Sequence, residues 1–425
     1  MNQNLFSENP VEITTLSNGF TVATEATPNV ATASLGVWVG SGSRNEQASE
    51  HGLSHLIEHM AFKGTTSRSA RQVAEDIENV GGEINAATGV EYTSYAARLL
   101  GEDISVALDV IGDLLTKSVF DKQELAREKS VILQEYAAVE DTPDDLIYDV
   151  FQETAFSGQP IGRPILGRPE TINSFDETAI RRFLDREYIP ANMALVATGP
   201  IQHAQIVEQA ERLFGHLPVH EIQPSEDGIY KGGEKRLPRD LEQANIVFGL
   251  PGLSFKHKDY YALHLFAHIL GGGLTSRLWH EVRETRGLAY VIDAFHWPFS
   301  DCGIFGIGAG TSQKDLAELL DVALECAWLA TENISEEEMA RAKRQMKVGM
   351  LTALESPGGR IERIARQLLT WKRLIPVSEV VRKVDALTAG EVCQAGRTAI
   401  SGNRTLVSIG PIDDLPALAQ LATKP

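Results

Sequence analysis

The chain opens with short stretches in which apolar and polar residues alternate, a pattern that predicts β-strands. Val11–Thr15 and Phe20–Ala23 alternate on either side of Asn18-Gly19, a dipeptide favoured in two-residue hairpin turns. Apolar runs at 33–39, 83–87, 92–99 and 193–198 have the length and composition of further strands. We therefore expect a sheet in the first half of the chain.

Between these strands the apolar residues recur at helical spacing. The expected helices cover roughly 49–60, 69–80, 104–116, 122–140 and 177–187, with a last one that ends near Phe214. This order of strands and helices is typical of the α+β class. It predicts mainly antiparallel sheets with helices packed on one face.

The periodic pattern stops between about His216 and Leu241, where proline, glycine and charged residues gather. A chain of 425 residues exceeds the size at which one hydrophobic core usually stops growing. We therefore predict an N-terminal domain over residues 1–216, a linker over 217–240 and a C-terminal domain over 241–425.

The two halves of the chain resemble each other. Leu263–His268 aligns with Ser54–His59, and Gly273–Arg277 then aligns with Gly64–Arg68 without a gap. Further along, two more pairs align at nearly the same offset: Glu338–Lys343 with Glu124–Lys129, and Leu406–Ile412 with Leu195–Ile201. Collinear matches of this kind predict two copies of one fold.

The copies differ in a set of acidic residues. Three carboxylates of the first copy align with residues that have no polar side chain: Glu58 with Ala267, Glu128 with Ala342, and Glu135 with Gly349. Residues that build the fold should recur in both copies, whereas residues that carry chemistry can occur once. His264 and His268 persist in the second copy without these acids, so we interpret them as structural.

The first copy contains the motif H-x-x-E-H in His55, Glu58 and His59. Two histidines four residues apart on a helix share one face and can bind one metal ion. A catalytic zinc site takes three protein ligands and a water. Glu128 and Glu135 lie two helical turns apart on one face, so one could be the third ligand while the other holds a histidine ring. Their spacing leaves both assignments open.

Charge and cysteine usage exclude several functions. The chain has 39 Lys and Arg against 58 Asp and Glu, a net charge of −19, which disfavours nucleic acid as a partner. It lacks an apolar run of membrane-spanning length, so we expect no membrane partner either. Three scattered cysteines fit a reducing compartment, and Met1–Pro10 has no features of a signal peptide. We therefore expect a cytoplasmic protein.

At this point the chain resembles the pitrilysin superfamily of zinc peptidases, of the M16 type. It is most similar to the processing-peptidase subfamily, which includes mitochondrial processing peptidase and its bacterial relatives. The resemblance covers nearly the whole chain and rests on 52–65, Asn85-Ala86 with Thr93 and Tyr95, Glu128 through Glu135, 190–193, and Gly271 to Tyr290.

The resemblance implies roles for individual residues. In that family the acid 76 residues beyond the second histidine is the third zinc ligand, which implies Glu135, with Glu128 supporting it. An Arg and a Tyr seven residues apart hold the substrate near the scissile bond, which implies Arg283 and Tyr290. Asn85 and Ala86 resemble the edge-strand segment onto which peptide substrates add a strand.

The expected function is therefore that of a zinc endopeptidase with one Zn²⁺ per chain. Glu58 would be the general base and a zinc-bound water the nucleophile. Relatives work as paired halves around a chamber, so the resemblance implies a homodimer in which Arg283 and Tyr290 reach the partner's zinc.

Two alternatives to a zinc peptidase share part of this pattern. A noncatalytic core-type subunit of a larger complex would share the fold but should have degraded zinc residues, and here they are complete. A lyase of the S-ribosylhomocysteine type shares H-x-x-E-H but is much shorter and uses a cysteine ligand, whereas this chain has no cysteine before Cys302.

Overall fold

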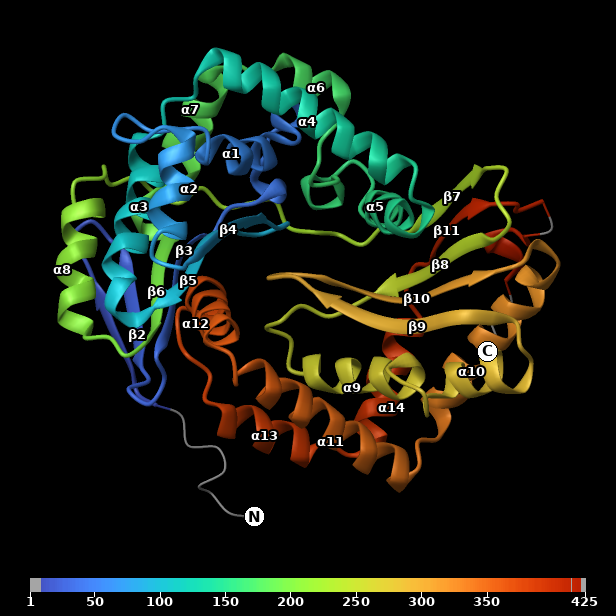
Figure 1. The fold of residues 1–425 in the computed structure, drawn as a ribbon. Helices are drawn as coiled ribbons and strands as arrows, with labels where there is room; N and C mark the ends of the chain where they lie inside the picture. Colours follow the sequence, from blue (N-terminus) through green and yellow to red (C-terminus); the bar gives the residue numbers. More distant parts are fainter. Residues whose placement is uncertain (1–8, 414, 422–425) are drawn as a thin grey trace. The chain divides into compact units, whose positions relative to one another are not determined.

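The structure of the chain is a computed structural model, and it describes residues 9–413 and 415–421 (Figure 1). The chain forms two compact units, and neither is a single stretch of sequence. The first consists of Met1–Tyr136, Ile165–Ser225 and Met350–Ser378, and the second of Ala137–Pro164, Glu226–Gly349 and Glu379–Pro425. The expected division into 1–216 and 241–425 therefore does not coincide with the compact units, because each unit takes in segments from the other half.

The first unit is built on a six-stranded sheet in the order β1-β2-β6-β3-β5-β4. Strands β2 and β6 are parallel, and every other pair in this sheet is antiparallel. The predicted hairpin is present, and Gly19 in its turn has a positive φ of 94°, which glycine adopts without strain. The strands are β1 (Val11–Thr15), β2 (Thr21–Ala26), β3 (Thr32–Val39), β4 (Glu83–Thr88), β5 (Thr93–Leu100) and β6 (Met193–Gly199).

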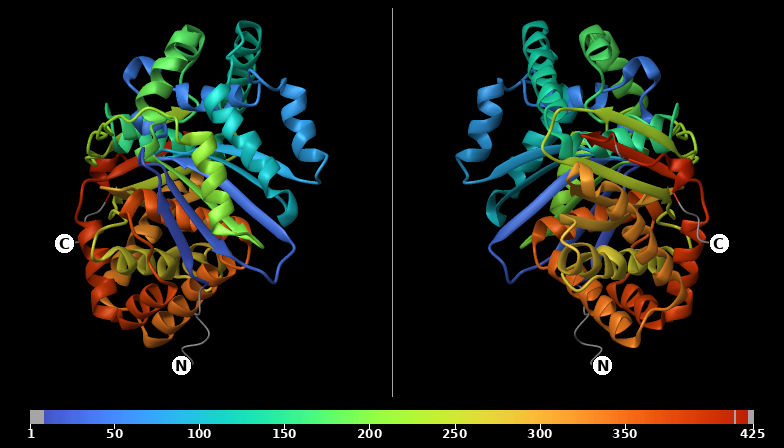
Figure 2. Two further views of the ribbon diagram at one scale, coloured as in Figure 1. Left: turned by 90° about the vertical axis from the view of Figure 1, so that its left-hand side faces the viewer. Right: turned by 90° about the vertical axis from the view of Figure 1, so that its right-hand side faces the viewer.

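Helices cover both faces of this sheet. On one face α3 (Ile104–Lys117) and α8 (His203–Phe214) bury apolar residues with the strands, and Figure 2 (left) shows α8 lying across them. On the other face α12 (Pro357–Trp371) packs Ile361 and Ile364 against Trp38. Burial from both sides explains why every residue of β6 is buried. The remaining helices are α1 (Leu53–Ala61), α2 (Ala70–Glu78), α4 (Lys122–Glu140), α6 (Pro169–Ser174) and α7 (Glu177–Glu187).

The second unit repeats this architecture. Its five-stranded sheet has the order β7-β11-β8-β10-β9, with β7 and β11 parallel and the other pairs antiparallel. Strands β2-β6-β3-β5-β4 of the first sheet have the same spatial order and the same relative directions as these five strands. The second sheet consists of β7 (Gly233–Pro238), β8 (Ala244–Pro251), β9 (Ala289–Pro298), β10 (Gly303–Thr311) and β11 (Thr405–Gly410).

One face of the second sheet carries α9 (Tyr260–Gly271), α10 (Leu316–Glu332) and α14 (Ala389–Ile400), which form a common apolar core with the strands. The opposite face carries α5 (Pro143–Ala155), whose Phe151 is fully buried and contacts Phe295 of β9. The remaining α-helices are α11 (Glu336–Ala353) and α13 (Val377–Ala386).

Helices α5 and α12 are exchanged between the copies. Both follow a long helix and begin with a proline, Pro143 and Pro357, yet α5 packs on the second sheet and α12 on the first. This exchange is why each compact unit draws on both halves of the sequence.

The α+β fold of two domains is confirmed, and the strands and helices expected in the first half lie within a few residues of their predicted ends. The predicted linker is wrong at its end, because Gly233–Pro238 forms β7, which pairs with β11. The Gly271–Gly273 segment ends α9, and Gly271 lets that helix approach the backbone of Ala294 closely. Within the described residues, no helix is long and apolar enough to cross a membrane.

Candidate metal centre

The helix that carries the H-x-x-E-H motif is anchored at its first turn. Gly52 precedes α1 with a φ of 92°, and a Cβ there would lie 2.7 Å from the Cα of Gly167. The carboxylate of buried Glu46 accepts hydrogen bonds from the backbone N–H groups of Gly52 (2.9 Å) and Ser54 (2.7 Å). A carboxylate at a helix N-terminus satisfies free N–H groups and complements the helix dipole. The start of α1 is therefore held in place.

The apolar face of α1 determines where its polar residues lie. Leu53, Leu56, Ile57 and Met60 are buried in a core that includes residues of α4 and α7. His55, Glu58 and His59 are only half-buried and occupy the remaining part of the helix surface. Packing of one stripe thus presents the three polar residues together.

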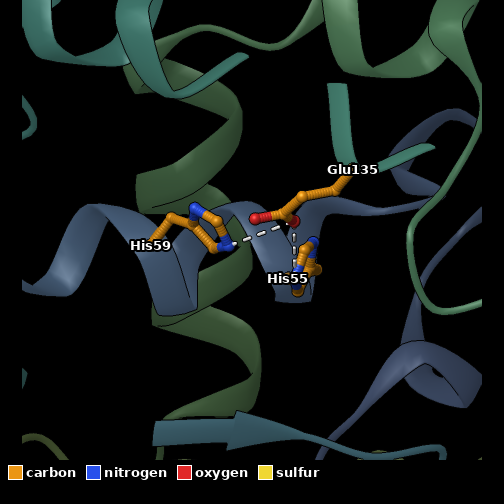
Figure 3. Close-up of side chains that lie close together, drawn as sticks. All are labelled: His55, His59 and Glu135. Atoms are coloured by element: carbon orange, nitrogen blue, oxygen red, sulfur yellow. Dashed lines mark ion pairs between the residues drawn. The ribbon is translucent and has the colours of Figure 1, made fainter. Parts of the chain in front are cut away.

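Three side chains converge in the first unit: His55 and His59 from α1 and Glu135 from α4 (Figure 3). One ligand atom from each lies within 4.8 Å of the other two. The Oε2 atom of Glu135 is 3.8 Å from Nε2 of His55 and 3.6 Å from Nε2 of His59. Among the described residues, no other group of three or more His, Cys, Asp or Glu side chains meets this criterion.

These distances suit a shared metal ion better than direct bonds. A contact of 3.6 Å or more is too long for a hydrogen bond. Ligands about 2.0–2.1 Å from a tetrahedral zinc ion lie about 3.3 Å from each other, so a small inward movement would complete the site. Two imidazoles and a carboxylate are also a ligand set found in catalytic zinc sites. The three residues therefore fit zinc.

The protonation state of His55 also favours metal binding. Burial, together with the charge of the neighbouring His59, lowers the pKa of His55 to about 4. Its imidazole is thus neutral at pH 7, which is the form that donates a lone pair to a metal.

Glu128 lies behind His59. Its Oε2 is 3.0 Å from Nδ1 of His59, and its Oε1 is 2.8 Å from Nζ of Lys63. Its side chain is 8% exposed, against 42% for Glu135. A carboxylate that accepts the Nδ1–H bond leaves the Nε2 lone pair facing the cluster. The geometry thus places Glu135 within the cluster and Glu128 outside it, a distinction that helical spacing left open.

Glu58 is not part of the group of converging ligands and is held by the end of a strand. Its Oε2 accepts a hydrogen bond from the hydroxyl of Thr88, the last residue of β4, at 2.6 Å. Thr88 and Lys63 each form a hydrogen bond or ion pair with one acid of the site, and neither was predicted from the sequence. Neither belongs to a residue type or spacing that marks a metal site, although both lie close to the motif segments.

Asn85 and Ala86 lie on β4, the edge strand of the first sheet. β4 pairs with β5 and has no second strand beside it among the described residues. Asn85 is exposed and Ala86 is buried, in keeping with side chains that alternate across a strand. An unpaired edge of this kind can accept another strand.

Arg283 and Tyr290 lie in the second unit and contact each other. The guanidinium of Arg283 is 4.6 Å from the centre of the Tyr290 ring and 4.0 Å from that of Trp279. Arg283 lies in a π-helical segment, Trp279–Thr285, and Tyr290 is 74% exposed on β9. Stacking on two rings orients the guanidinium, and the phenol remains accessible.

The histidines of the second copy have different surroundings. Nε2 of His268 lies 3.0 Å from the amide oxygen of Gln345. His264 is half-buried, and desolvation together with the charge of His268 lowers its pKa. No group of three potential ligands includes either residue within the described chain. Their interpretation as structural residues stays a prediction.

Comparisons with known proteins point the same way as this geometry. Residues 21–169 match the family description "Insulinase (Peptidase family M16)", and residues 174–346 match "Peptidase M16 inactive domain". The chain is 38% identical over 402 residues to an "Uncharacterized zinc protease" of Rickettsia felis, which covers 94% of this chain and 98% of the relative.

A second similar protein comes from a different organism. The "Probable mitochondrial-processing peptidase subunit beta, mitochondrial" of Arabidopsis thaliana is 34% identical over 434 residues, covering 97% of this chain and 80% of the relative. Among solved structures, a protease from Helicobacter pylori has a TM-score of 0.89 at 21% identity, covering 95% of this chain and 100% of that one. At that identity the likeness concerns the fold alone.

Proposed function

This chain belongs to peptidase family M16, and from that membership we propose that it is a zinc-dependent endopeptidase. The observation that carries the proposal is the convergence of His55, His59 and Glu135 on one point. These residues would hold one zinc ion per chain. Zinc in such a site supplies Lewis-acid activation of a water molecule and of the scissile carbonyl.

Glu58 is the proton-transfer group of the proposed reaction. It is the only acid of the H-x-x-E-H motif, and it lies one residue before a ligand histidine without joining the ligand set. Its carboxylate accepts a proton from the attacking water and passes it to the nitrogen of the leaving amine as the C–N bond breaks. The hydrogen bond from Thr88 keeps one carboxylate oxygen engaged, which limits the rotation of Glu58.

Substrate binding in this proposal uses the edge of β4. A peptide that adds as a strand beside Asn85 and Ala86 would be recognised through its backbone. Because Thr88 ends the same strand and binds Glu58, the peptide edge and the proton-transfer group are linked through one strand. Peptides and unfolded segments are therefore the proposed substrates.

We further propose that the active form is a homodimer around an enclosed chamber, with Arg283 and Tyr290 acting on the partner's zinc site. Arg can donate a fork of hydrogen bonds to a carbonyl, and the exposed Tyr hydroxyl can help to stabilise an oxyanion. A complementation experiment tests this arrangement. If Glu58→Gln and Arg283→Ala chains exchange subunits freely, about a quarter of wild-type activity should return on mixing, because half of the dimers gain one intact site. Action within one chain predicts no recovery.

The proposal of an enzyme rather than a noncatalytic core subunit is tested by Glu58→Gln. This variant should keep its zinc, measured by elemental analysis, and lose peptidase activity by roughly a hundredfold or more. Glu78→Gln, an exposed acid on α2, is the matched control and should retain full activity. Full activity in purified Glu58→Gln would falsify the assignment of the base, and an inactive wild-type protein that binds zinc would favour the subunit role.

A further inference from the structure

The second unit contains a cavity of about 710 Å³ between its sheet and the helices α10 and α14. Its floor consists of Phe248, Leu250 and Ile307 from the strands β8 and β10. Its walls include Leu324 and Trp328 of α10 and Ile400 of α14. The cavity is thus predominantly apolar, and its volume lies within the ~300–1,000 Å³ typical of small-molecule sites.

The duplication shows what fills the corresponding place in the first unit. There α8 packs on α3: Leu213 closes over Gly112, and Arg212 lies 3.8 Å from Asp109. Asp109 and Gly112 are the sixth and ninth residues of α3. The sixth and ninth residues of α10, the matching helix, are Asp321 and Leu324, and both line the cavity. The cavity therefore occupies the place that α8 takes in the first copy.

The second copy fills this place only in part. Within the described residues no α-helix follows β11, and the chain after Gly410 instead buries Ile412, Leu415 and Leu421 against the core. Arg404 donates a hydrogen bond to the backbone oxygen of Leu421 (3.1 Å), which holds this segment beside the cavity. The space that remains is lined by residues of the sheet, of α10 and of the segment from Arg397 to Arg404.

Two arginines line the cavity without carboxylate partners. Arg397 donates to the backbone oxygen of Thr331 and to the side chain of Gln394, and Arg404 donates to Leu421. Neither guanidinium forms an ion pair with a described residue, although the chain carries a net charge of −19. Each guanidinium has five N–H donors, so both keep donors for a ligand. The carboxylates that line the cavity, Asp321 and Glu325, belong to the wall formed by α10.

We propose that this cavity binds a single-chain amphiphile with an anionic head group, such as a fatty-acid carboxylate. The apolar chain lies against Phe248, Ile307 and Trp328, and the head group is held by Arg397 and Arg404. Arginine matches the planar geometry of a carboxylate and binds it with two parallel hydrogen bonds. The site is independent of the metal cluster, since all of its lining residues belong to the second unit.

Trp328 makes the cavity testable in the full-length protein. Titration with dodecanoate below its micelle concentration should change tryptophan fluorescence saturably, with one site per chain by calorimetry. Trp328→Phe should remove most of the fluorescence change and keep the heat of binding. Arg397→Gln and Arg404→Gln should each weaken binding about tenfold. Arg382→Gln, an exposed arginine on α13, is the control and should bind as wild type.

Ligand chemistry supplies the second arm of the experiment. Dodecanol and dodecyltrimethylammonium should bind at least about tenfold more weakly than dodecanoate, because they cannot accept the arginine hydrogen bonds. Leu324→Trp, checked for native circular dichroism and thermal unfolding, should fill the cavity and abolish binding. The protein should not co-sediment with anionic phospholipid vesicles. This result would distinguish binding of a free amphiphile from binding of a lipid in a bilayer.

Several outcomes would overturn the proposal. These are the absence of both heat and fluorescence change, equal affinity for dodecanol, or unchanged binding in a folded Leu324→Trp variant. A different occupant is also recognisable. If native mass spectrometry finds a second polypeptide that Leu324→Trp displaces, and dodecanoate does not bind, the cavity is the docking site of a partner helix.

Discussion

Glu128 and Glu135 lie on one face of α4 but have different contacts, so their replacement by glutamine should have different consequences. Glu135 faces both histidines, whereas Glu128 accepts from Nδ1 of His59 and pairs with Lys63. In Glu128→Gln the amide can keep one hydrogen bond to His59, but it loses the negative charge that favours Nε2 as a metal donor. The ligand set itself remains complete.

The expected magnitudes follow from these contacts. Loss of a hydrogen-bonding partner behind a ligand histidine typically weakens metal binding about 10- to 100-fold, or about 1.4–2.7 kcal/mol. Glu128→Gln should therefore regain most of its turnover when zinc is added to saturation. Glu135→Gln removes a ligand from a three-residue site, so added zinc should not restore it to wild-type turnover.

Zinc affinity measured by competition with a chromogenic chelator, followed by kcat at saturating zinc, distinguishes the two variants. Glu124→Gln is the matched control, because Glu124 lies on the same helix and pairs only with Arg127 among the described residues. It should match wild type in both measurements. If Glu135→Gln is rescued by zinc and Glu128→Gln is not, the two roles are reversed and the geometric reasoning is refuted.

Three further predictions follow from individual contacts. Thr88→Val should lower kcat roughly tenfold with zinc content unchanged, because Glu58 loses its hydrogen bond; unchanged kcat would show that Thr88 does not position the base. Burial raises the pKa of Asp113, but hydrogen bonds from Thr65, Ser67 and Arg68 outweigh it and bring the pKa down to about 2. The pKa of Asp113 is thus lower in the folded than in the unfolded protein. Asp113 should therefore add about 2 kcal/mol to the free energy of unfolding above pH 4, and this contribution should be lost as the pH falls toward 2. Asp113→Asn should therefore lower the urea midpoint of the metal-free protein at pH 7, and the difference from wild type should shrink in acid; a pH-independent difference would contradict this. Phe151→Ala should lower the free energy of unfolding by about 3–5 kcal/mol, because α5 loses a fully buried ring that packs on the second sheet. A urea midpoint within error of wild type would contradict that packing.

Several features of the fold could be read from local pattern alone. The limits of α4 and α7 follow from helical periodicity, and the first hairpin follows from Asn18-Gly19 between alternating residues. The strand β7 could not be found in this way, because Gly233–Pro238 is mostly polar and becomes a strand only by pairing with β11. The exchange of α5 and α12 is likewise invisible in the sequence, since an amphipathic helix does not specify which sheet it will cover.

Some residues of the candidate site could likewise be predicted from the sequence, and others could not. His55, Glu58 and His59 could be identified from the sequence because helical geometry alone brings them together, and the loss of three acids from the second copy marked Glu128 and Glu135. Lys63 and Thr88 could not, because their contacts with these acids depend on how α1, α4 and β4 pack.

The sequence by itself determined the duplication, the metal-binding motif and the acids that accompany it, because each depends on residue types at short or repeated spacings. Residue spacing left open which acid meets the histidines, because Glu128 and Glu135 lie seven residues apart on one helix face. The tertiary structure decided that Glu135 meets both histidines while Glu128 lies behind one of them. It also decided that the place filled by α8 in the first copy is a cavity in the second. Among the described residues after β11 no α-helix forms, so the residues of α10 that correspond to the α8-contacting positions of α3 line a cavity instead.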